Sequence, residues 1–118
     1  MPRLARLVLS LTAVLFLQSP ALAETELEQG QRLFSKHCKV CHGEQGDGLT
    51  FAANALSPPP RNFLTETSRK ELTRQRILES IQNGRKGTAM MPWKSVLTET
   101  EIQALASYIR IRLMEMKE

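Results

Sequence analysis

The sequence predicts an all-α domain of three to five short helices. Apolar residues recur at helical spacing around Glu26–His37 and again after Thr98, where Thr98-Glu99-Thr100-Glu101 forms a capping box. No strand pattern and no internal repeat stands out between these segments. The 118 residues are 42% hydrophobic, 24% charged and 5% aromatic, which is typical of one globular domain and excludes the disordered, collagenous and coiled-coil classes.

Residues 1–23 have the pattern of a cleaved signal peptide. Arg3 and Arg6 form a basic start, an apolar stretch runs over Leu7–Leu17, and Ala21-Leu22-Ala23 is a small-x-small cleavage site. The stretch is shorter than the about 20 apolar residues of a membrane-spanning helix, so an uncleaved anchor is the weaker alternative. We therefore expect residues 24–118 to form one domain in the periplasm, without stable membrane insertion.

Net charge and cysteine spacing narrow the classes of function. The 16 basic and 12 acidic residues give +4, and without Arg3 and Arg6 the balance is 14 against 12, or +2. That is too little for a nucleic-acid binder. The only two cysteines lie three positions apart, too close to staple a fold. Because so small a domain often depends on a disulfide, a metal or a cofactor, a cofactor site is expected.

The first helix should bury one face. Leu27, Gly30 and Phe34 follow each other at positions i, i+3 and i+7. Within a helix, Gly30 costs about 1 kcal/mol relative to alanine. A close crossing with another helix would offset that cost.

Cys38, Cys41 and His42 form the C-x-x-C-H pattern of covalent haem attachment. One helical turn brings the two thiols to the spacing of the two haem vinyl groups, and the histidine that follows supplies a nitrogen to the iron. A thioredoxin-like pair would need a βαβ context. A zinc site would need four ligands, and only His37 adds to the motif. The pattern therefore predicts one covalently attached haem c.

The middle of the chain predicts a loop and two helical segments. Gly43 to Phe63 is loop, stiffened by three consecutive prolines. A short helical turn is expected over residues 66–72. A helix is expected over Thr73–Asn83, with Thr73 as N-cap and Gly84 after its end. Its ridge toward the haem would consist of Arg76, Ile77, Leu78 and Ile81.

Residues 84–93 predict a loop that offers a methionine to the iron. The segment holds Met90 and Met91 between glycine and proline residues. A methionine thioether opposite a histidine fills the coordination sphere and raises the reduction potential. The alternative is that these methionines only fill a gap in the core.

The last predicted helix starts at the capping box of Thr98 and presents an apolar stripe. That stripe consists of Ile102, Leu105, Ala106, Ile109 and Leu113.

Together these motifs make the mature chain resemble a class I cytochrome c of the short bacterial or photosynthetic type. The resemblance rests on Gly30-x-x-Leu33-Phe34-x-x-x-Cys38-x-x-Cys41-His42-Gly43-x-x-Gly46-x-Gly48, on Gly-Thr-Ala-Met-Met-Pro-Trp at 87–93, and on the last helix. It implies the cytochrome c fold, in which the helices wrap around one haem and the first and last helices cross closely. Gly30 and Phe34 would then meet Leu105, Tyr108 and Ile109.

The resemblance leaves the distal iron ligand between two neighbours. The proline that usually follows the ligand points to Met91. Counting back from Trp93, Leu97 and Thr98 points to Met90, which we favour. The other methionine would then pack beside the haem edge.

The resemblance also implies contacts around the haem. In similar cytochromes a proline carbonyl accepts the second N–H of the ligand histidine, and Pro58 or Pro59 would serve here. The alternative is that this segment is only a rigid surface turn. Arg61 and Trp93 are candidates to donate to the haem propionates, with a solvated arginine and a packed tryptophan as alternatives. We expect His37 to be a surface histidine rather than a second ligand.

An iron with two protein ligands has no open position for a substrate, so the sequence predicts a monomeric one-electron carrier without enzymatic activity. Its partners would be membrane or periplasmic redox proteins, bound transiently. Basic residues that would steer acidic partners, or simply be solvated, are Lys36, Lys39, Arg85, Lys86 and Lys94. Two rivals remain: a haem subunit of a dehydrogenase or oxidase complex, and a gas-binding or peroxidatic haem protein with an open sixth site.

Overall fold

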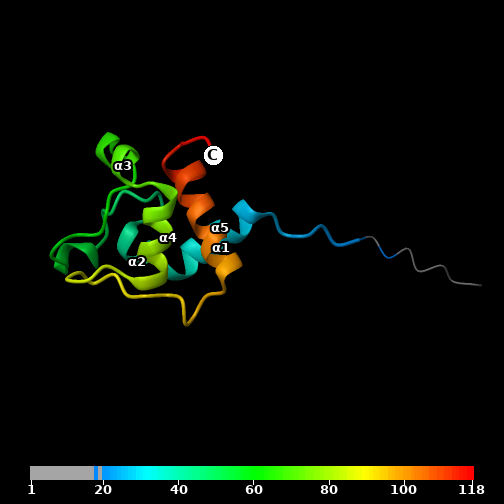
Figure 1. Cartoon of the computed structure of the whole chain (residues 1–118), viewed down its shortest axis with the longest axis horizontal. Coiled ribbons are helices and arrows are strands. Elements are labelled where there is room, and N and C mark those ends of the chain that lie inside the picture. The colour runs from blue at the N-terminus through cyan, green and yellow to red at the C-terminus, as the bar shows by residue number, and fades with distance from the viewer. Residues whose placement is uncertain (1–17, 19) are drawn as a thin grey trace, which may run out of the picture.

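Five α-helices and two short helical turns make up the computed structural model, which describes residue 18 and residues 20–118 (Figure 1). No strand occurs among these residues, which confirms the predicted all-α class. Most of the predicted signal peptide lies outside the described residues. In chain order the elements are α1 (Glu26–His37), α2 (Lys39–His42), η1 (Ala53–Ala55), α3 (Glu66–Glu71), α4 (Arg74–Asn83), α5 (Glu99–Tyr108) and η2 (Ile109–Leu113).

Helix α1 begins at a capping box that the sequence analysis missed. The Thr25 hydroxyl accepts the Glu28 N–H at 3.2 Å, and a Glu28 carboxylate oxygen accepts the Thr25 N–H at 2.8 Å. These two bonds satisfy donors that a helix start leaves without partners. The helix buries Gly30, Leu33 and Phe34, whereas Leu27 is only half-buried.

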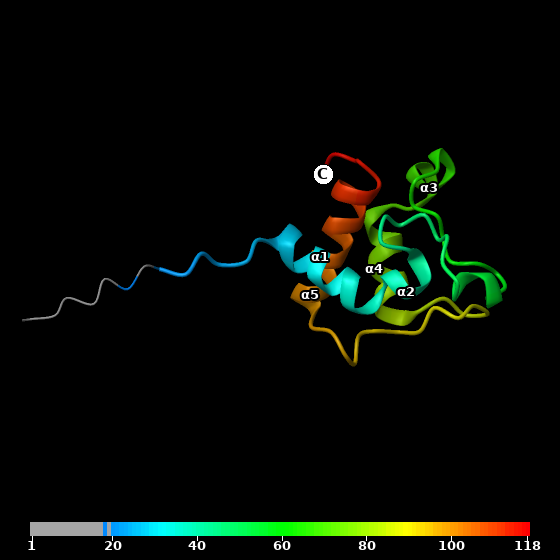
Figure 2. The same ribbon diagram turned by 180° about the vertical axis from the view of Figure 1, so that it is seen from behind.

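The centre of the fold is a close crossing of α1 and α5, which lie side by side in both ribbon views (Figures 1 and 2). A Cβ atom added to Gly30 would lie 2.2 Å from the Ala104 carbonyl oxygen and 2.6 Å from Tyr108 Cβ. Phe34 packs on Tyr108, with ring centroids 5.5 Å apart. The predicted reason for a glycine within this helix is therefore confirmed.

Helices α3 and α4 also match their predicted positions. Thr73 caps α4 by accepting the Arg76 N–H at 3.1 Å, and Gly84 ends the helix in a left-handed conformation. The α4 side chains Ile77, Leu78 and Ile81 are buried as predicted. The Arg76 side chain is exposed, so its predicted place on the apolar ridge is wrong.

Helix α5 begins at the predicted capping box but ends differently from the prediction. Thr98 accepts the Glu101 N–H at 3.2 Å. After Tyr108 the chain widens into the π-helical turn η2 instead of continuing as α-helix. The wider turn still buries Ile109 and Leu113, which is why an apolar spacing alone did not reveal it.

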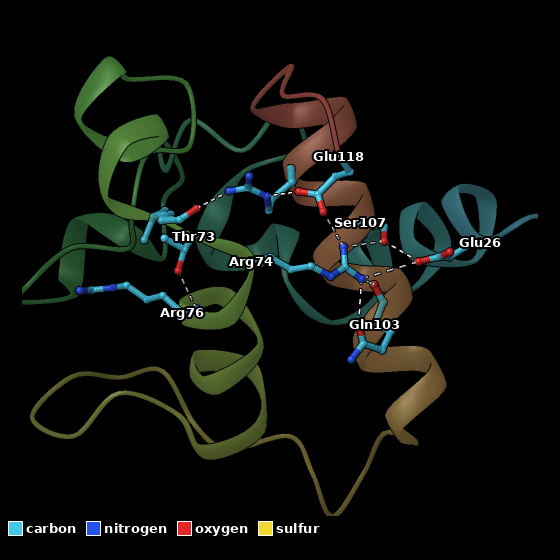
Figure 3. A network of polar contacts seen from close by, with 9 residues as sticks. Glu26, Thr73, Arg74, Arg76, Gln103, Ser107 and Glu118 are labelled. Atoms are coloured by element: carbon cyan, nitrogen blue, oxygen red, sulfur yellow. Dashed lines mark hydrogen bonds and ion pairs between the residues drawn. The ribbon is translucent and has the colours of Figure 1, made fainter.

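The Arg74 guanidinium ties α4 to α5 and to the end of the chain (Figure 3). It donates to the Ser107 hydroxyl at 3.0 Å, to the Gln103 side-chain oxygen at 2.8 Å and to Glu118 at 3.1 Å. The Ser107 hydroxyl in turn donates to Glu26 of α1. This network joins three helices around the outside of the core.

The segment between α4 and α5 runs as an extended loop along one side of the domain, coloured yellow to orange in both ribbon views (Figures 1 and 2). It carries both candidate methionine ligands. Among the described residues, no helix has the length and apolar character needed to cross a membrane.

Candidate functional site

The C-x-x-C-H residues lie at the junction of α1 and α2. Cys38 lies between the last residue of α1 and the first residue of α2. Its N–H donates to the Phe34 carbonyl at 2.9 Å. Cys41 lies within α2, and His42 is its last residue. Both thiols are free and half-buried. The single predicted turn is present, although His37 and His42 end two successive helices rather than sharing one.

The His42 ring is held by one hydrogen bond and one aromatic stack. Its Nδ1 atom lies 3.2 Å from the Arg61 carbonyl oxygen, which accepts the Nδ1–H. The ring stacks on Phe63, with centroids 4.8 Å apart and planes 16° apart. Because Nδ1 is occupied, Nε2 keeps the lone pair that can bind a metal.

Burial determines the protonation of His42 and Cys38. Loss of hydration lowers the pKa of His42, and the hydrogen bond with the Arg61 carbonyl opposes this only in part. The neutral imidazole is therefore favoured, which is the form that ligates iron. Burial, followed by the influence of Cys41, raises the pKa of the Cys38 thiol to about 12. Before haem attachment Cys38 is thus a protonated thiol.

The prediction that Pro58 or Pro59 would accept the histidine N–H is wrong. Both prolines are exposed, and the Arg61 main-chain carbonyl takes this position. The physical reason is the path of the loop. The Phe63 N–H donates to the Gly46 carbonyl at 2.8 Å, which draws the residues just before Phe63 toward α2.

The Arg61 side chain points to a different partner from the one predicted. Its guanidinium forms an ion pair with Glu71 at the end of α3. The predicted contact of Arg61 with a haem propionate remains a prediction. The main chain of the same residue nevertheless contacts His42, so Arg61 links α3 to the candidate ligand.

The methionine loop, residues 84–97 between α4 and the N-cap of α5, is closed by hydrogen bonds within the loop and to α4. The Arg85 N–H donates to the Met90 carbonyl at 3.0 Å, and the Met90 N–H donates to the Thr88 hydroxyl at 3.1 Å. Gly84 has φ +69°, and a Cβ there would lie 2.6 Å from the Met90 carbonyl oxygen. A glycine is therefore required where this loop leaves α4.

The two methionines differ in their surroundings. Met90 is partly buried and packs against the hydrophobic core, whereas Met91 is 51% exposed. This difference agrees with the preference for Met90 as the distal ligand, which stays a prediction.

Trp93 and His37 lie together, which the sequence did not indicate. Their ring centroids are 4.9 Å apart and their planes are inclined by 52°. Both side chains are half-buried, so His37 is not the simple surface histidine that was expected. The predicted contact of Trp93 with a haem propionate stays a prediction.

The donor set fits a haem c. The free thiol of Cys38 lies just before α2 and that of Cys41 lies within it. The next residue, His42, is oriented by the Arg61 carbonyl and keeps Nε2 available. Thioethers to two vinyl groups need two such thiols, and the iron needs such a nitrogen. Over residues 18 and 20–118, no three or more His, Cys, Asp or Glu side chains gather as a metal cluster, so the zinc alternative gains no support there.

The fold and this donor set define a c-type cytochrome domain. A family model described as cytochrome C oxidase, cbb3-type, subunit III matches residues 25–109. The chain belongs to this family. It is therefore a c-type cytochrome with covalently attached haem c, and it is an electron-transfer protein by class.

Similar proteins cover different shares of the chain. The cbb3-type cytochrome c oxidase subunit CcoP of Azospirillum brasilense is 28% identical over 82 residues, which are 70% of this chain and 27% of that relative. The chain thus spans about a quarter of the length of this curated relative.

Two solved structures are also similar. The Kuenenia stuttgartiensis reducing HAO-like protein complex Kustc0457/Kustc0458 matches with 26% identity and a TM-score of 0.63, over 77% of this chain and 45% of that one. The KustC0563 c-type cytochrome matches with 34% identity and a TM-score of 0.56, over 69% of this chain and 93% of that one.

Proposed function

We propose that this chain is a periplasmic monohaem one-electron carrier with His42 and Met90 as axial ligands and Cys38 and Cys41 as the thioether residues. The observation that carries the proposal is the orientation of His42. Its Nδ1–H is committed to the Arg61 carbonyl and its ring rests on Phe63, so Nε2 has one defined direction. Such outer contacts orient a ligand and increase its basicity.

Bound haem c supplies a reversible exchange of one electron at its iron. The residues of this chain determine what else is possible there. With both His42 and Met90 holding the iron, no coordination position would remain for a substrate. Met90 and Trp93 of the loop pack against the hydrophobic cluster that includes Ile77, Leu78 and Ile81 of α4. Apolar surroundings of this kind would limit the access of water to the ligands.

The proposed partners are membrane-bound or periplasmic redox proteins that bind transiently. The basic side chains Lys36 and Lys39 of α1 and α2 are exposed, as are Arg85, Lys86 and Lys94 of the methionine loop. Two of them have weak local partners: Lys39 pairs with Glu44 at 3.7 Å, and Lys94 donates to Asn83 at 3.3 Å. These five exposed cations are available to steer acidic partners at low ionic strength.

The absorption spectrum of the oxidised holoprotein tests the proposal. Ligation of ferric iron by methionine gives a weak far-red band, and we expect this band together with a low-spin spectrum. A high-spin spectrum without the band would overturn the assignment of Met90 and would favour gas binding or peroxide chemistry. Absence of covalent haem would contradict the roles of Cys38, Cys41 and His42.

A second candidate is a haem subunit of a larger redox complex. It is favoured by the similarity to an oxidase subunit and to a chain of an HAO-like complex. Size-exclusion chromatography of periplasmic and solubilised membrane fractions, followed by haem absorbance, distinguishes the two. A carrier elutes near the 13.3 kDa of the full chain or below it, whereas a subunit elutes with a much larger assembly.

A further inference from the structure

The contact between His37 and Trp93 joins the two halves of the proposed haem site. His37 is the last residue of α1 and directly precedes Cys38, while Trp93 lies three residues after Met90. The two ring centroids are 4.9 Å apart. Residues far apart in the sequence thus bring the attachment helix against the methionine loop.

The backbone that carries each ring is hydrogen-bonded to a different part of the fold. His37 is held by α1, whose next residue, Cys38, donates its N–H to the Phe34 carbonyl. The Trp93 N–H donates to the Ile81 carbonyl of α4 at 2.8 Å. The Trp93 carbonyl accepts the Leu97 N–H at 2.9 Å. The ring contact therefore joins two segments that each carry a candidate haem-binding residue.

The hydrogen bonds of the methionine loop to other elements reach α4. Within the described chain, its backbone hydrogen bonds reach the loop itself and the last residues of α4. Lys94 also donates to Asn83 of α4. The ring of His37 adds an aromatic contact between the loop and the end of α1.

We propose that His37 is a positioning residue for Met90: its ring on Trp93 holds the methionine loop closed and so keeps the Met90 sulfur on the iron. This inference rests on the proposed ligation by Met90. In this proposal His37 acts through its ring contact with Trp93. An inclined aromatic pair of this kind changes a local equilibrium by about twofold to tenfold.

Competition by imidazole measures this effect. Exogenous imidazole binds ferric iron only when Met90 has left, so its apparent affinity rises in proportion to the open fraction of the loop. In the holoprotein at one fixed pH, we expect His37→Ala to raise this affinity by about twofold to tenfold. His37→Phe retains a ring and should restore an affinity near that of the wild type.

Two controls separate positioning from general stability. Phe51→Ala removes an aromatic ring that is 95% exposed and should leave imidazole binding unchanged. Ile102→Val weakens the buried α5 face and should lower the resistance to denaturant without raising imidazole affinity. Equal shifts for Ile102→Val and His37→Ala would show that His37 acts only through stability and would overturn the proposal.

A double-mutant cycle with Trp93→Leu tests the route. If His37 acts through Trp93, the effect of His37→Ala on imidazole affinity disappears in the Trp93→Leu background. Additive effects, or no effect of His37→Ala in a protein that shows the far-red band, overturn the role of His37 alone. A wild-type protein without that band overturns Met90 ligation, and the role of His37 falls with it.

Discussion

The α1–α5 crossing and the methionine loop are held by different kinds of contact. At the crossing, Gly30 allows the α1 backbone to meet Ala104, and Leu105 is fully buried. In the loop, by contrast, Met90 is only half-buried and Met91 is 51% exposed. The crossing is a packed interior, whereas the loop is held by a few hydrogen bonds, one aromatic contact and the partial packing of Met90 and Trp93 on the core.

This difference separates the roles of the two regions. Close packing fixes the helices through contacts that the chain makes with itself. In the proposed site the loop would present the Met90 thioether to the cofactor. We therefore expect changes in the crossing to alter global stability, and changes in the loop to alter the spectrum and the reduction potential.

The largest expected effect is the loss of covalent haem. In the Cys38→Ala/Cys41→Ala double variant neither thioether can form, so no haem should remain with the chain after denaturing electrophoresis. Mass spectrometry gives the same result as the absence of the haem mass increment. Val40→Ala is the matched control, because Val40 lies between the two cysteines and is 63% exposed. Haem retained covalently by the double variant would contradict the attachment site.

The second effect distinguishes the two neighbouring methionines. Met90→Ala should abolish the far-red band and lower the reduction potential by a sizeable part of the about 0.8 V range that axial ligands span. Met91→Ala should preserve the band, since its side chain is largely exposed. Potentiometric titration with optical detection measures both quantities. The reverse pattern would assign the iron to Met91.

The third effect belongs to the helix crossing. Gly30→Ala places a Cβ 2.2 Å from the Ala104 carbonyl oxygen, so the helices must separate. Strain of this kind costs about 1–3 kcal/mol, and an approach of 2.2 Å to a backbone oxygen favours the upper part of that range, above the about 1 kcal/mol that alanine gains in helix propensity. Denaturant unfolding should show a loss of stability, while the far-red band stays in place. Gln31→Ala, at an exposed neighbouring position, is the control.

An unchanged unfolding free energy in Gly30→Ala would contradict the close crossing. Loss of the far-red band under native conditions would contradict the expectation that changes in the crossing alter global stability and leave the spectrum intact. In that case the two regions would respond as one unit, and the contrast between them would have to be abandoned.

Much of the helical framework, α1 to α5, could be predicted because its sequence signals are local. The caps at Thr73 and Thr98 need only residues within one turn, and the buried face of α4 follows from its spacing. Gly30 was informative because a glycine within a helix is costly unless something lies against it. The cysteine pair and His42 were recognisable because attachment chemistry fixes their spacing.

The unpredicted features depend on the path of the chain. The partner of His42 is a main-chain carbonyl, and every residue of the proline segment carries one, so Arg61 could not be distinguished from Pro58 or Pro59. The His37–Trp93 contact joins segments separated by helices α2, α3 and α4 and by the loops that connect them. Such long-range contacts follow from tertiary packing and have no local signature.

The smallest expected effect concerns the carboxyl of Glu118, the last residue of the sequence. The hydrogen bond from Arg110 lowers the pKa of the Glu118 carboxyl, and Arg74 adds to this effect at 3.1 Å (Figure 3). A carboxyl with a lowered pKa in the folded state stabilises the fold above its unfolded pKa. That contribution is lost as the pH falls through the lowered value.

Glu118→Gln should therefore remove at most about 1 kcal/mol at neutral pH and almost nothing well below pH 4, because both proteins are then neutral at this position. Denaturant unfolding at a series of pH values measures the difference. Glu115→Gln alters an exposed carboxylate of the same tail and is the matched control. A stability difference between Glu118→Gln and the wild type that persists undiminished at low pH would mean that the tail is held by packing of Met114 and Met116 rather than by charge.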